Sequence, residues 1–321
     1  MLIRRGLALG CGGVVGHAWS AVALAAVEQA LDWDARDAEV IVGTSGGAEI
    51  AAALGAGLST QEVVAASTGE GRVHPLLAEH VSRSPGRFPP RPAAALPALG
   101  LLRASTARGS VHPAVAAVLP RGRGDAAWLR DYGRALAAGN GWVKHPRTWL
   151  VAADAATGGR VAFGAPSAPK ADLGDALAAS WAIPGWFPPV GIADRWYVDG
   201  GAVSSVSADL LAPLGLDEVI VISPMTSEQP VPGRGAARFE RMLRHQMTRG
   251  LNEELEALRA SGARVIRVEP GAEDLVTMGA NFMDASRRPA TVTTATRTAP
   301  SRVAAAIRAA AAVEAMGGVA R

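Results

Sequence analysis

Residues 39–54 read EVIVGTSGGAEIAAAL, which is a clear signal of a strand followed by a turn and a helix. Its first part, Glu39–Gly43, is a short apolar run typical of a buried strand, and Gly46–Leu54 continues with a helical pattern. The same order occurs before it, where the apolar run Leu7–Gly10 leads through a glycine-rich turn to the Ala/Leu/Val-rich segment Ala18–Leu31. Two successive strand–turn–helix units predict an α/β fold.

The rest of the chain carries further signals of the same kind. Strands are expected at 148–152, 160–163, 195–198, 218–223 and 264–268, and helices at 173–182, 239–260 and from about 301. Residues 69–147 differ, because they are rich in proline and arginine. We expect them to form helices and loops outside the sheet, either as a cap-like insertion over the active site or as a surface insertion without a catalytic role. No internal repeat is visible, so residues 1–321 are expected to form a single domain.

Composition limits the class of protein. Of the 321 residues, 49% are hydrophobic and 19% are charged, which suits a globular core and argues against disorder. The net charge of +3 is too small to imply nucleic-acid binding, although it would allow weak attraction to an anionic membrane surface. The one cysteine, Cys11, leaves no intrachain disulfide, and no Cys/His cluster has the spacing of a zinc site. No metal and no cofactor are therefore expected.

We see no clear targeting signal near the ends of the sequence. The apolar run at the N-terminus is too short for a secretory signal, and we see no stretch of about 18 apolar residues that would span a membrane. We therefore expect a cytoplasmic protein, either free or peripheral at a membrane. The oligomeric state is left open.

The strongest local motif is Gly43-Thr-Ser45-Gly-Gly47, which matches G-x-S-x-G between a strand and a helix. A sharp turn there would expose the Ser45 hydroxyl at a helix N-terminus, and small residues two before and two after it would avoid clashes. The same residues would also fit a tight turn with an N-capping serine. The flanking strand and helix favour a nucleophile.

A second glycine-rich turn, Gly10-Cys-Gly-Gly-Val-Val-Gly16, follows the first strand. Its backbone N–H groups could bind an anion. The register does not match G-x-G-x-x-G, so a dinucleotide phosphate is a poor fit. The oxyanion of an acyl-transfer intermediate fits better, with Gly12 and Gly13 as donors.

A third motif, Asp199-Gly-Gly201, comes directly after a strand. Its carboxylate could accept a proton from a serine hydroxyl if the site tunes its pKa. Considered alone, Asp-Gly is more often a turn.

Taken in this order, the three motifs resemble those of the patatin-like phospholipase family: a glycine-rich oxyanion loop, then G-x-S-x-G, then D-G-G/A far downstream. A fourth segment, ASWAIPGWFPPV at residues 179–190, resembles the family's S-x-A-x-P-x-x-F-x-P stretch. The resemblance covers roughly residues 5–210 in scattered blocks. It implies a three-layer α/β/α fold with a mostly parallel central sheet.

The resemblance also implies the chemistry. Ser45 would attack an ester carbonyl, Asp199 would accept its proton, and the N–H groups of Gly12, Gly13 and Val14 would bind the oxyanion. The remaining motif glycines would support these turns: Gly10, Gly16, Gly43, Gly47, Gly200 and Gly201. Three aromatic residues before the aspartate strand would line an acyl pocket or simply fill the core: Trp181, Trp186 and Phe187.

This sequence departs from the family pattern at three positions. Cys11 replaces a glycine of the oxyanion loop, and Val15 replaces its basic residue. The loss of that cation would lower activity or shift substrates toward neutral esters. Gly46 stands where alanine is usual, and we expect this change to cost little sterically.

Other candidate residues are weaker. Cys11 is expected to pack rather than react, and His17 to pack near a helix N-terminus. His245 would be the base of a Ser–Asp–His hydrolase, but it lies in a mixed-charge helix and reads as a surface residue. Asp154 also follows a strand and rivals Asp199, yet no Gly-Gly follows it.

The sequence thus predicts a serine hydrolase that cleaves acyl esters of lipids, as a phospholipase, lysophospholipase or esterase. Two alternatives stay open: a catalytically weak lipid-binding or regulatory protein on the same fold, and an acyltransferase that discharges the acyl-enzyme to an alcohol.

Overall fold

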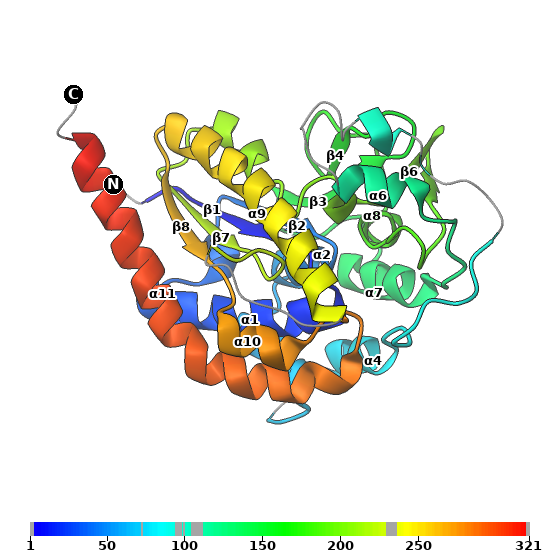
Figure 1. The fold of residues 1–321 in the computed structure, drawn as a ribbon, viewed down its shortest axis with the longest axis horizontal. Helices are drawn as coiled ribbons and strands as arrows, with labels where there is room; N and C mark the ends of the chain where they lie inside the picture. The colour runs from blue at the N-terminus through cyan, green and yellow to red at the C-terminus, as the bar shows by residue number, and fades with distance from the viewer. Residues whose placement is uncertain are drawn as a thin grey trace.

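The computed structural model describes residues 3–71, 73–93, 98, 100–103, 112–228 and 236–318. Its centre is an eight-stranded sheet in the order β5-β6-β3-β2-β1-β7-β8, with β4 paired to β3 (Figure 1). The strands are β1 (Arg5–Leu9), β2 (Val40–Thr44), β3 (Thr148–Asp154), β4 (Arg160–Phe163), β5 (Val190–Ile192), β6 (Arg195–Asp199), β7 (Glu218–Ile222) and β8 (Arg264–Val268).

Most of the sheet is parallel. The pairs β3–β2, β2–β1, β1–β7 and β7–β8 are parallel, whereas β4 and β6 pair with β3 antiparallel and β5 pairs with β6 antiparallel. The prediction of a mostly parallel central sheet is confirmed. The short strand β5 was not among the expected strands, because three residues carry too little pattern to be recognised.

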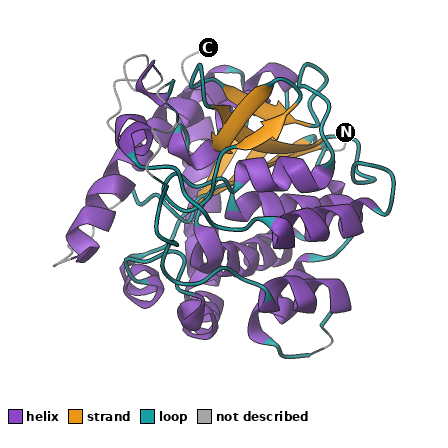
Figure 2. Cartoon of the chain, turned by 90° about the vertical axis from the view of Figure 1, so that its right-hand side faces the viewer, coloured by secondary structure: helices purple, strands orange, loops and turns teal. Residues whose placement is uncertain are grey.

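Helices cover both faces of the sheet, which confirms the α/β/α class (Figure 2). On one face, alternate residues such as Leu7 and Leu9 of β1 pack with the helices α1 (Gly13–Leu31), α2 (Gly46–Ala56), α8 (Leu173–Ser180) and α11 (Arg288–Gly318). On the other face, Ala8 of β1 belongs to a core completed by Leu251, Leu255 and Leu258 of α9 (Ala236–Ala260). Strands buried on both faces read as continuous apolar runs, which is why they were visible in the sequence.

Helix α1 lies between the sheet and α11 (Figure 1). Among the described residues it is the one helix that length and hydropathy would allow to cross a membrane, and 67% of its apolar window is buried inside the protein. The helix is not an uninterrupted apolar stretch, because it contains His17, Ser20 and Glu28. The burial shows α1 as a core helix of this fold.

The C-terminal helix is longer than the sequence indicated. A start near residue 301 was expected, because Pro300 lacks an N–H and usually ends or kinks a helix. Helix α11 instead begins at Arg288 and passes through Pro300. Its packing against α1 and β8 outweighs the cost of the proline.

The segment 69–147 contributes no strand to the sheet in its described parts. It holds α4 (Pro75–Ser82), α6 (His112–Val118) and α7 (Ala127–Ala137), and it follows α3 (Thr60–Thr68). Residues 72, 94–97, 99 and 104–111 of the expected insertion lie outside the described residues. That the segment forms a cap stays a prediction.

Candidate active site

Ser45 lies at the turn between β2 and α2, where it is the N-cap of α2. Its backbone has φ 54° and ψ −121°, a left-handed conformation that is strained for any residue except glycine. The flanking glycines allow this turn: a Cβ at Gly43 would lie 2.5 Å from the Gly47 carbonyl oxygen, and one at Gly47 would overlap the Leu9 carbonyl. The expected sharp strand-to-helix turn is therefore present.

Ser180, at the end of α8, holds this turn in place. Its hydroxyl oxygen accepts a hydrogen bond from the Ser45 N–H at 2.8 Å and donates one to the Val151 carbonyl at 2.7 Å. All three groups are buried. Ser180 stands within the ASWAIPGWFPPV segment, but the sequence did not show that it bonds to the nucleophile candidate.

Asp199 ends β6 and lies beside Ser45. Thr44 pairs with Val151 on β3, and Ala152 pairs with Asp199, so strand register brings the two motifs to one place. The Asp199 carboxylate accepts a hydrogen bond from the Gly201 N–H at 2.7 Å, and the Ser45 hydroxyl lies close enough to lower the pKa of the carboxyl group. Ser45 and Asp199, which are 154 positions apart in sequence (199 minus 45), are thus in contact.

Burial raises the pKa of Asp199 from its ordinary 3.8 to about 7, against the lowering effects of the Ser45 hydroxyl and the Gly201 N–H. A carboxyl group with this pKa exchanges protons near neutral pH, which an ordinary aspartate does not. The arrangement can therefore accept a proton from Ser45 and return it.

The glycine-rich turn lies next to Ser45 and begins α1. The N–H of Cys11 donates to the Ser205 carbonyl at 2.7 Å, and that of Val15 donates to the Phe282 carbonyl at 3.1 Å. Within the described part of the chain, no acceptor is found for the N–H groups of Gly12, Gly13 and Val14. The first N–H groups of a helix lack intrahelical partners, so this turn can bind an anion.

The remaining motif glycines allow close packing around the two turns. A Cβ at Gly10 would lie 3.1 Å from the Ser205 carbonyl, and at Gly16 it would lie 3.2 Å from the Pro224 ring. A Cβ at Gly200 would lie 2.7 Å from the Val151 carbonyl. Larger residues would separate the motifs from their neighbours.

Gly46 is more constrained than expected. A Cβ at this position would lie 2.7 Å from the Gly13 carbonyl oxygen, closer than real Cβ atoms approach an oxygen. Glycine fits this contact without steric cost, whereas an alanine would push the two turns apart. Gly46 thus permits their close approach.

Cys11 packs against the aspartate motif. A Cβ at Gly201 would lie 2.9 Å from the Cys11 sulfur, and burial together with the nearby Asp199 raises the pKa of the thiol far above its usual range. A thiol that stays protonated is a poor nucleophile. This agrees with the expected packing role.

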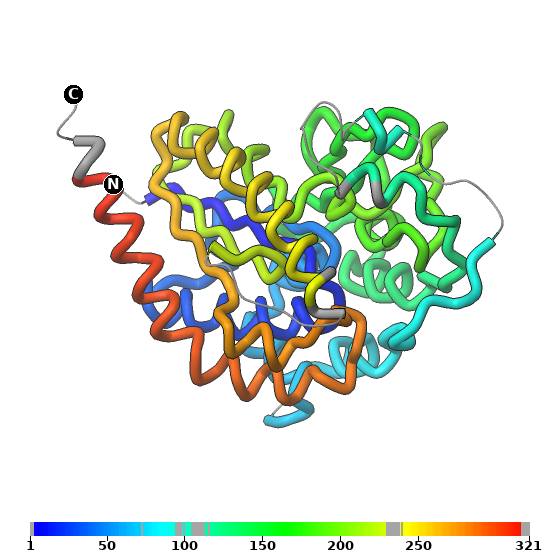
Figure 3. The backbone as a smooth tube through the Cα atoms, in the orientation of Figure 1, coloured from blue at the N-terminus to red at the C-terminus, as the bar shows by residue number. Residues whose placement is uncertain are grey.

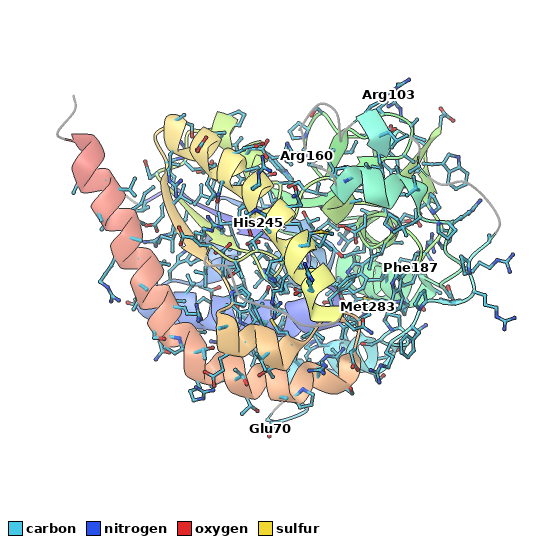
Figure 4. All side chains as sticks on the ribbon, in the orientation of Figure 1. Glu70, Arg103, Arg160, Phe187, His245 and Met283 are labelled. Atoms are coloured by element: carbon cyan, nitrogen blue, oxygen red, sulfur yellow. The ribbon has the colours of Figure 1, made fainter. Side chains whose placement is uncertain are left out.

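The three aromatic candidates occupy different environments. Trp181 is buried and lies edge-on to Trp128 of α7, with ring centroids 5.5 Å apart. Phe187, labelled in Figure 4, is also buried, whereas Trp186 is partly exposed. Whether they contact an acyl chain stays a prediction.

One buried cluster was missed. Glu49, one turn after Ser45 on α2, pairs with His80 of α4, whose ring stacks on Tyr132 of α7 with centroids 3.8 Å apart. His17 of α1 is also buried, and desolvation lowers its pKa to about 4, so it is uncharged at neutral pH. Acidic and histidine residues scattered over three segments give no sequence pattern that would reveal this cluster.

The two rival candidates have other surroundings. His245 lies on α9 and is exposed (Figure 4). Asp154 ends β3, where it accepts hydrogen bonds from the N–H groups of Ala156 and Thr157 at 2.8 and 2.9 Å and pairs with Arg195 at 2.9 Å. Within the described ranges, no group of three or more His, Cys, Asp or Glu side chains could hold a metal ion.

Comparison with known proteins gives one family match. Residues 107–212 match the model of the family described as patatin-like phospholipase; this range contains Ser180 and Asp199, and Ser45 lies before it. No curated protein sequence matches the chain.

Two solved structures are similar at low scores. VipD from Legionella pneumophila is 14% identical with a TM-score of 0.46, and the alignment covers 96% of this chain and 67% of VipD. The type III effector protein ExoU is 16% identical with a TM-score of 0.36, and the alignment covers 95% of this chain and 53% of ExoU. Neither score supports a conclusion about function. The match over residues 107–212 confirms the resemblance that the motifs predicted: this chain is similar to the patatin-like phospholipases.

Proposed function

We propose that this chain hydrolyses acyl esters of lipids, with Ser45 as nucleophile and Asp199 as its base. The observation that carries the proposal is the strand register that places buried Asp199 beside buried Ser45, which stands at a strained turn. The match to the patatin-like phospholipase model supports a lipid substrate. The free N–H groups of the adjacent turn supply the third part that acyl transfer needs.

The reaction would run in two halves. The Ser45 oxygen attacks the ester carbonyl carbon while its proton passes to Asp199, and the oxyanion lies against the N–H groups of Gly12, Gly13 and Val14. The intermediate collapses, the ester C–O bond breaks, and Asp199 returns the proton to the leaving alcohol. Water then attacks the acyl-Ser45 ester while its proton passes to Asp199. The bond between the acyl carbon and the Ser45 oxygen breaks, Asp199 returns the proton to that oxygen, and the free fatty acid leaves.

The raised pKa of Asp199 explains why no histidine is needed. A base of pKa about 7 is ionised in part at neutral pH and accepts a serine proton better than an ordinary carboxylate does. The surroundings that raise it are apolar burial, and no other charged group is a cause of the shift.

The test measures hydrolysis of short and long p-nitrophenyl esters and of phosphatidylcholine and lysophosphatidylcholine. Ser45→Ala and Asp199→Asn are each expected to lower kcat by on the order of a thousandfold or more. Asp154→Asn is the matched control, because it makes the same change on the neighbouring strand at a residue that holds a turn. It should keep the wild-type rate.

Two results would overturn the proposal. A folded wild type that cleaves none of these esters would favour the catalytically weak lipid-binding protein. Activity that survives Asp199→Asn and disappears in His245→Ala would make the enzyme a Ser–Asp–His hydrolase instead.

A further inference from the structure

The charge of this chain is unevenly distributed. Residues 80–124 contain seven arginines and no aspartate, glutamate or lysine. The chain as a whole has a net charge of +3, so the remainder carries −4 (three minus seven). Residues 80–124 therefore carry a larger positive charge than the net charge of the whole protein.

Two parts of this stretch meet on the surface. The exposed run 86–92 contains Arg87, Phe88 and Arg91, and the Ala93 N–H that follows donates to the Arg121 carbonyl at 2.9 Å. Figure 3 shows the segment after α4 in cyan, running along the right-hand edge of the molecule. The hydrogen bond brings Arg121 and its neighbour Arg123 close to that run.

Aromatic side chains stand among these arginines. Phe88 is 71% exposed with the Arg87 guanidinium 5.1 Å from its ring centroid, and Trp196 is 58% exposed with that of Arg121 at 6.0 Å. We name this set the arginine surface: Arg87, Phe88, Arg91, Arg121, Arg123 and Trp196. Among the described residues, no carboxylate pairs with Arg91, Arg121 or Arg123, whereas Arg87 has Asp284 at 3.4 Å.

The arginine surface is joined to the oxyanion turn on one side. The Asn281 side-chain amide donates to the Arg87 carbonyl at 2.8 Å. The next residue, Phe282, accepts the Val15 N–H and lies so close to Gly13 that a Cβ there would be 2.6 Å from its ring. The first part of the surface thus borders the candidate oxyanion site.

A second connection leads to the nucleophile turn. The Gly124 N–H donates to the Trp186 carbonyl at 2.7 Å, and Trp186 follows Ser180 by six positions. Ser180 in turn accepts the Ser45 N–H. The second arginine segment is thus hydrogen-bonded to the loop that follows Ser180, while the first borders the candidate oxyanion turn.

We propose that the arginine surface binds an anionic lipid bilayer and holds the protein with the Ser45 site toward it. Guanidinium groups bind phosphates with two parallel hydrogen bonds, and clustered arginines are attracted to anionic leaflets. Exposed tryptophan and phenylalanine beside such arginines enter the interface between head groups and acyl chains. The functional value of this orientation rests on the proposed lipid hydrolysis. The binding of the arginine surface to an anionic bilayer does not depend on that proposal.

The test is sedimentation of the full chain with vesicles of phosphatidylcholine alone and of equal parts phosphatidylcholine and phosphatidylglycerol. The Ser45→Ala variant is used throughout, so that lipid cleavage and vesicle binding are separated. Binding is expected only to the anionic vesicles and is expected to weaken with added salt. Arg91→Gln, Arg121→Gln and Arg123→Gln together should reduce partitioning on the order of 100-fold.

The control neutralises three exposed arginines elsewhere, Arg249→Gln, Arg259→Gln and Arg308→Gln, with the same change in net charge. It should bind as the parent does. A second variant, Phe88→Ser, keeps every charge and should weaken binding without changing its salt dependence.

Three results would overturn the inference: equal binding to neutral and anionic vesicles, equal losses in the two triple variants, or tighter binding to single-stranded RNA than to anionic vesicles. The catalytic proposal is tested separately. The same arginine and Phe88 variants are made with Ser45 restored, and their rates of cleavage of short soluble esters are measured. Those rates should equal the wild-type rate whatever the vesicles show.

Discussion

At the scale of single residues, the proposed nucleophile Ser45 is kept in an unfavourable backbone conformation. A left-handed non-glycine residue costs on the order of 1–3 kcal/mol, and it persists where neighbouring contacts hold it. Ser180 supplies one such contact by accepting the Ser45 N–H. The sequence motif identified Ser45, but the contact that holds it comes from a residue 135 positions away.

Removing this contact should affect catalysis more than folding. In Ser180→Ala the buried Ser45 N–H loses its acceptor, which costs about 1–3 kcal/mol of stability. The turn relaxes and misplaces the hydroxyl, so kcat for short esters should fall about tenfold or more while KM changes little. Ser20→Ala is the control, because Ser20 is equally buried and its hydroxyl has no hydrogen-bond partner in the described chain. Equal kcat for the two variants would contradict the positioning role.

The raised pKa of Asp199 predicts a pH profile. If the ionised carboxylate is the base, as proposed, kcat/KM should rise with pH through an apparent pKa near 7 and then level. The measurement is hydrolysis of a short soluble ester from about pH 5 to about pH 9. A rate that is flat across this range would show that Asp199 does not set it.

The raised pKa of Asp199 also predicts that the stability of the folded protein changes with pH in the direction opposite to its activity. Because the folded protein holds this proton more tightly than the unfolded chain, stability falls as pH rises from the ordinary 3.8 through about 7. Ionised Asp199 lowers the free energy of unfolding by on the order of 4 kcal/mol. Asp199→Asn removes this cost, so its unfolding free energy relative to the wild type should be higher at about pH 8 than at about pH 5. A difference that does not vary with pH would contradict the shift.

At the scale of elements, the nucleophile turn and the oxyanion turn are in contact at Gly46 and Gly13. Gly46→Ala places a Cβ 2.7 Å from the Gly13 carbonyl, so the oxyanion turn must move. We expect a loss of kcat on the order of tenfold to a hundredfold, because displaced donors no longer meet the oxyanion. Gly250→Ala, on α9 with open space around its Cβ position, is the matched control and should gain about 0.5–1 kcal/mol of stability. Full activity in Gly46→Ala would contradict this contact.

The buried Glu49–His80 pair joins α2 to α4. Replacing His80 with alanine leaves the Glu49 carboxylate buried without its partner, which should cost about 3–5 kcal/mol. The double variant Glu49→Gln, His80→Ala should recover part of that loss, because the uncompensated charge is gone. Unfolding in urea measures the free energy of unfolding of the wild type, the two single variants and the double variant. If the losses of the single variants add up to that of the double variant, the two groups do not interact.

The elements differ in how well the sequence foretold them. Strands such as β2 and β7 were found because burial on both faces leaves an apolar run. The start of α11 was missed because Pro300 is a local signal that packing against α1 and β8 overrides. Ser45 and Asp199 could be proposed as site residues because each lies in a local motif, whereas the Glu49–His80 pair arises only from tertiary contacts.

At the scale of the whole molecule, the order of the strands does most to create the site. Placing β2 beside β3 and β3 beside β6 brings Ser45 to Asp199, although β6 comes late in the chain and runs antiparallel. The sequence showed that these strands exist but not which ones are neighbours. That Ser45 and Asp199 would lie together was expected only from the resemblance of the motif order to a known family.

The most direct test of the Ser45–Asp199 site is to find which residue a fluorophosphonate modifies. The wild-type protein is treated with the probe, digested, and the modified peptide is sequenced by mass spectrometry, with Asp199→Asn and Asp154→Asn treated in parallel. We expect the phosphonate on Ser45 alone, at a rate that collapses in Asp199→Asn and is unchanged in Asp154→Asn. Modification of another serine, or of Ser45 at the same rate without Asp199, would contradict the proposed nucleophile and base.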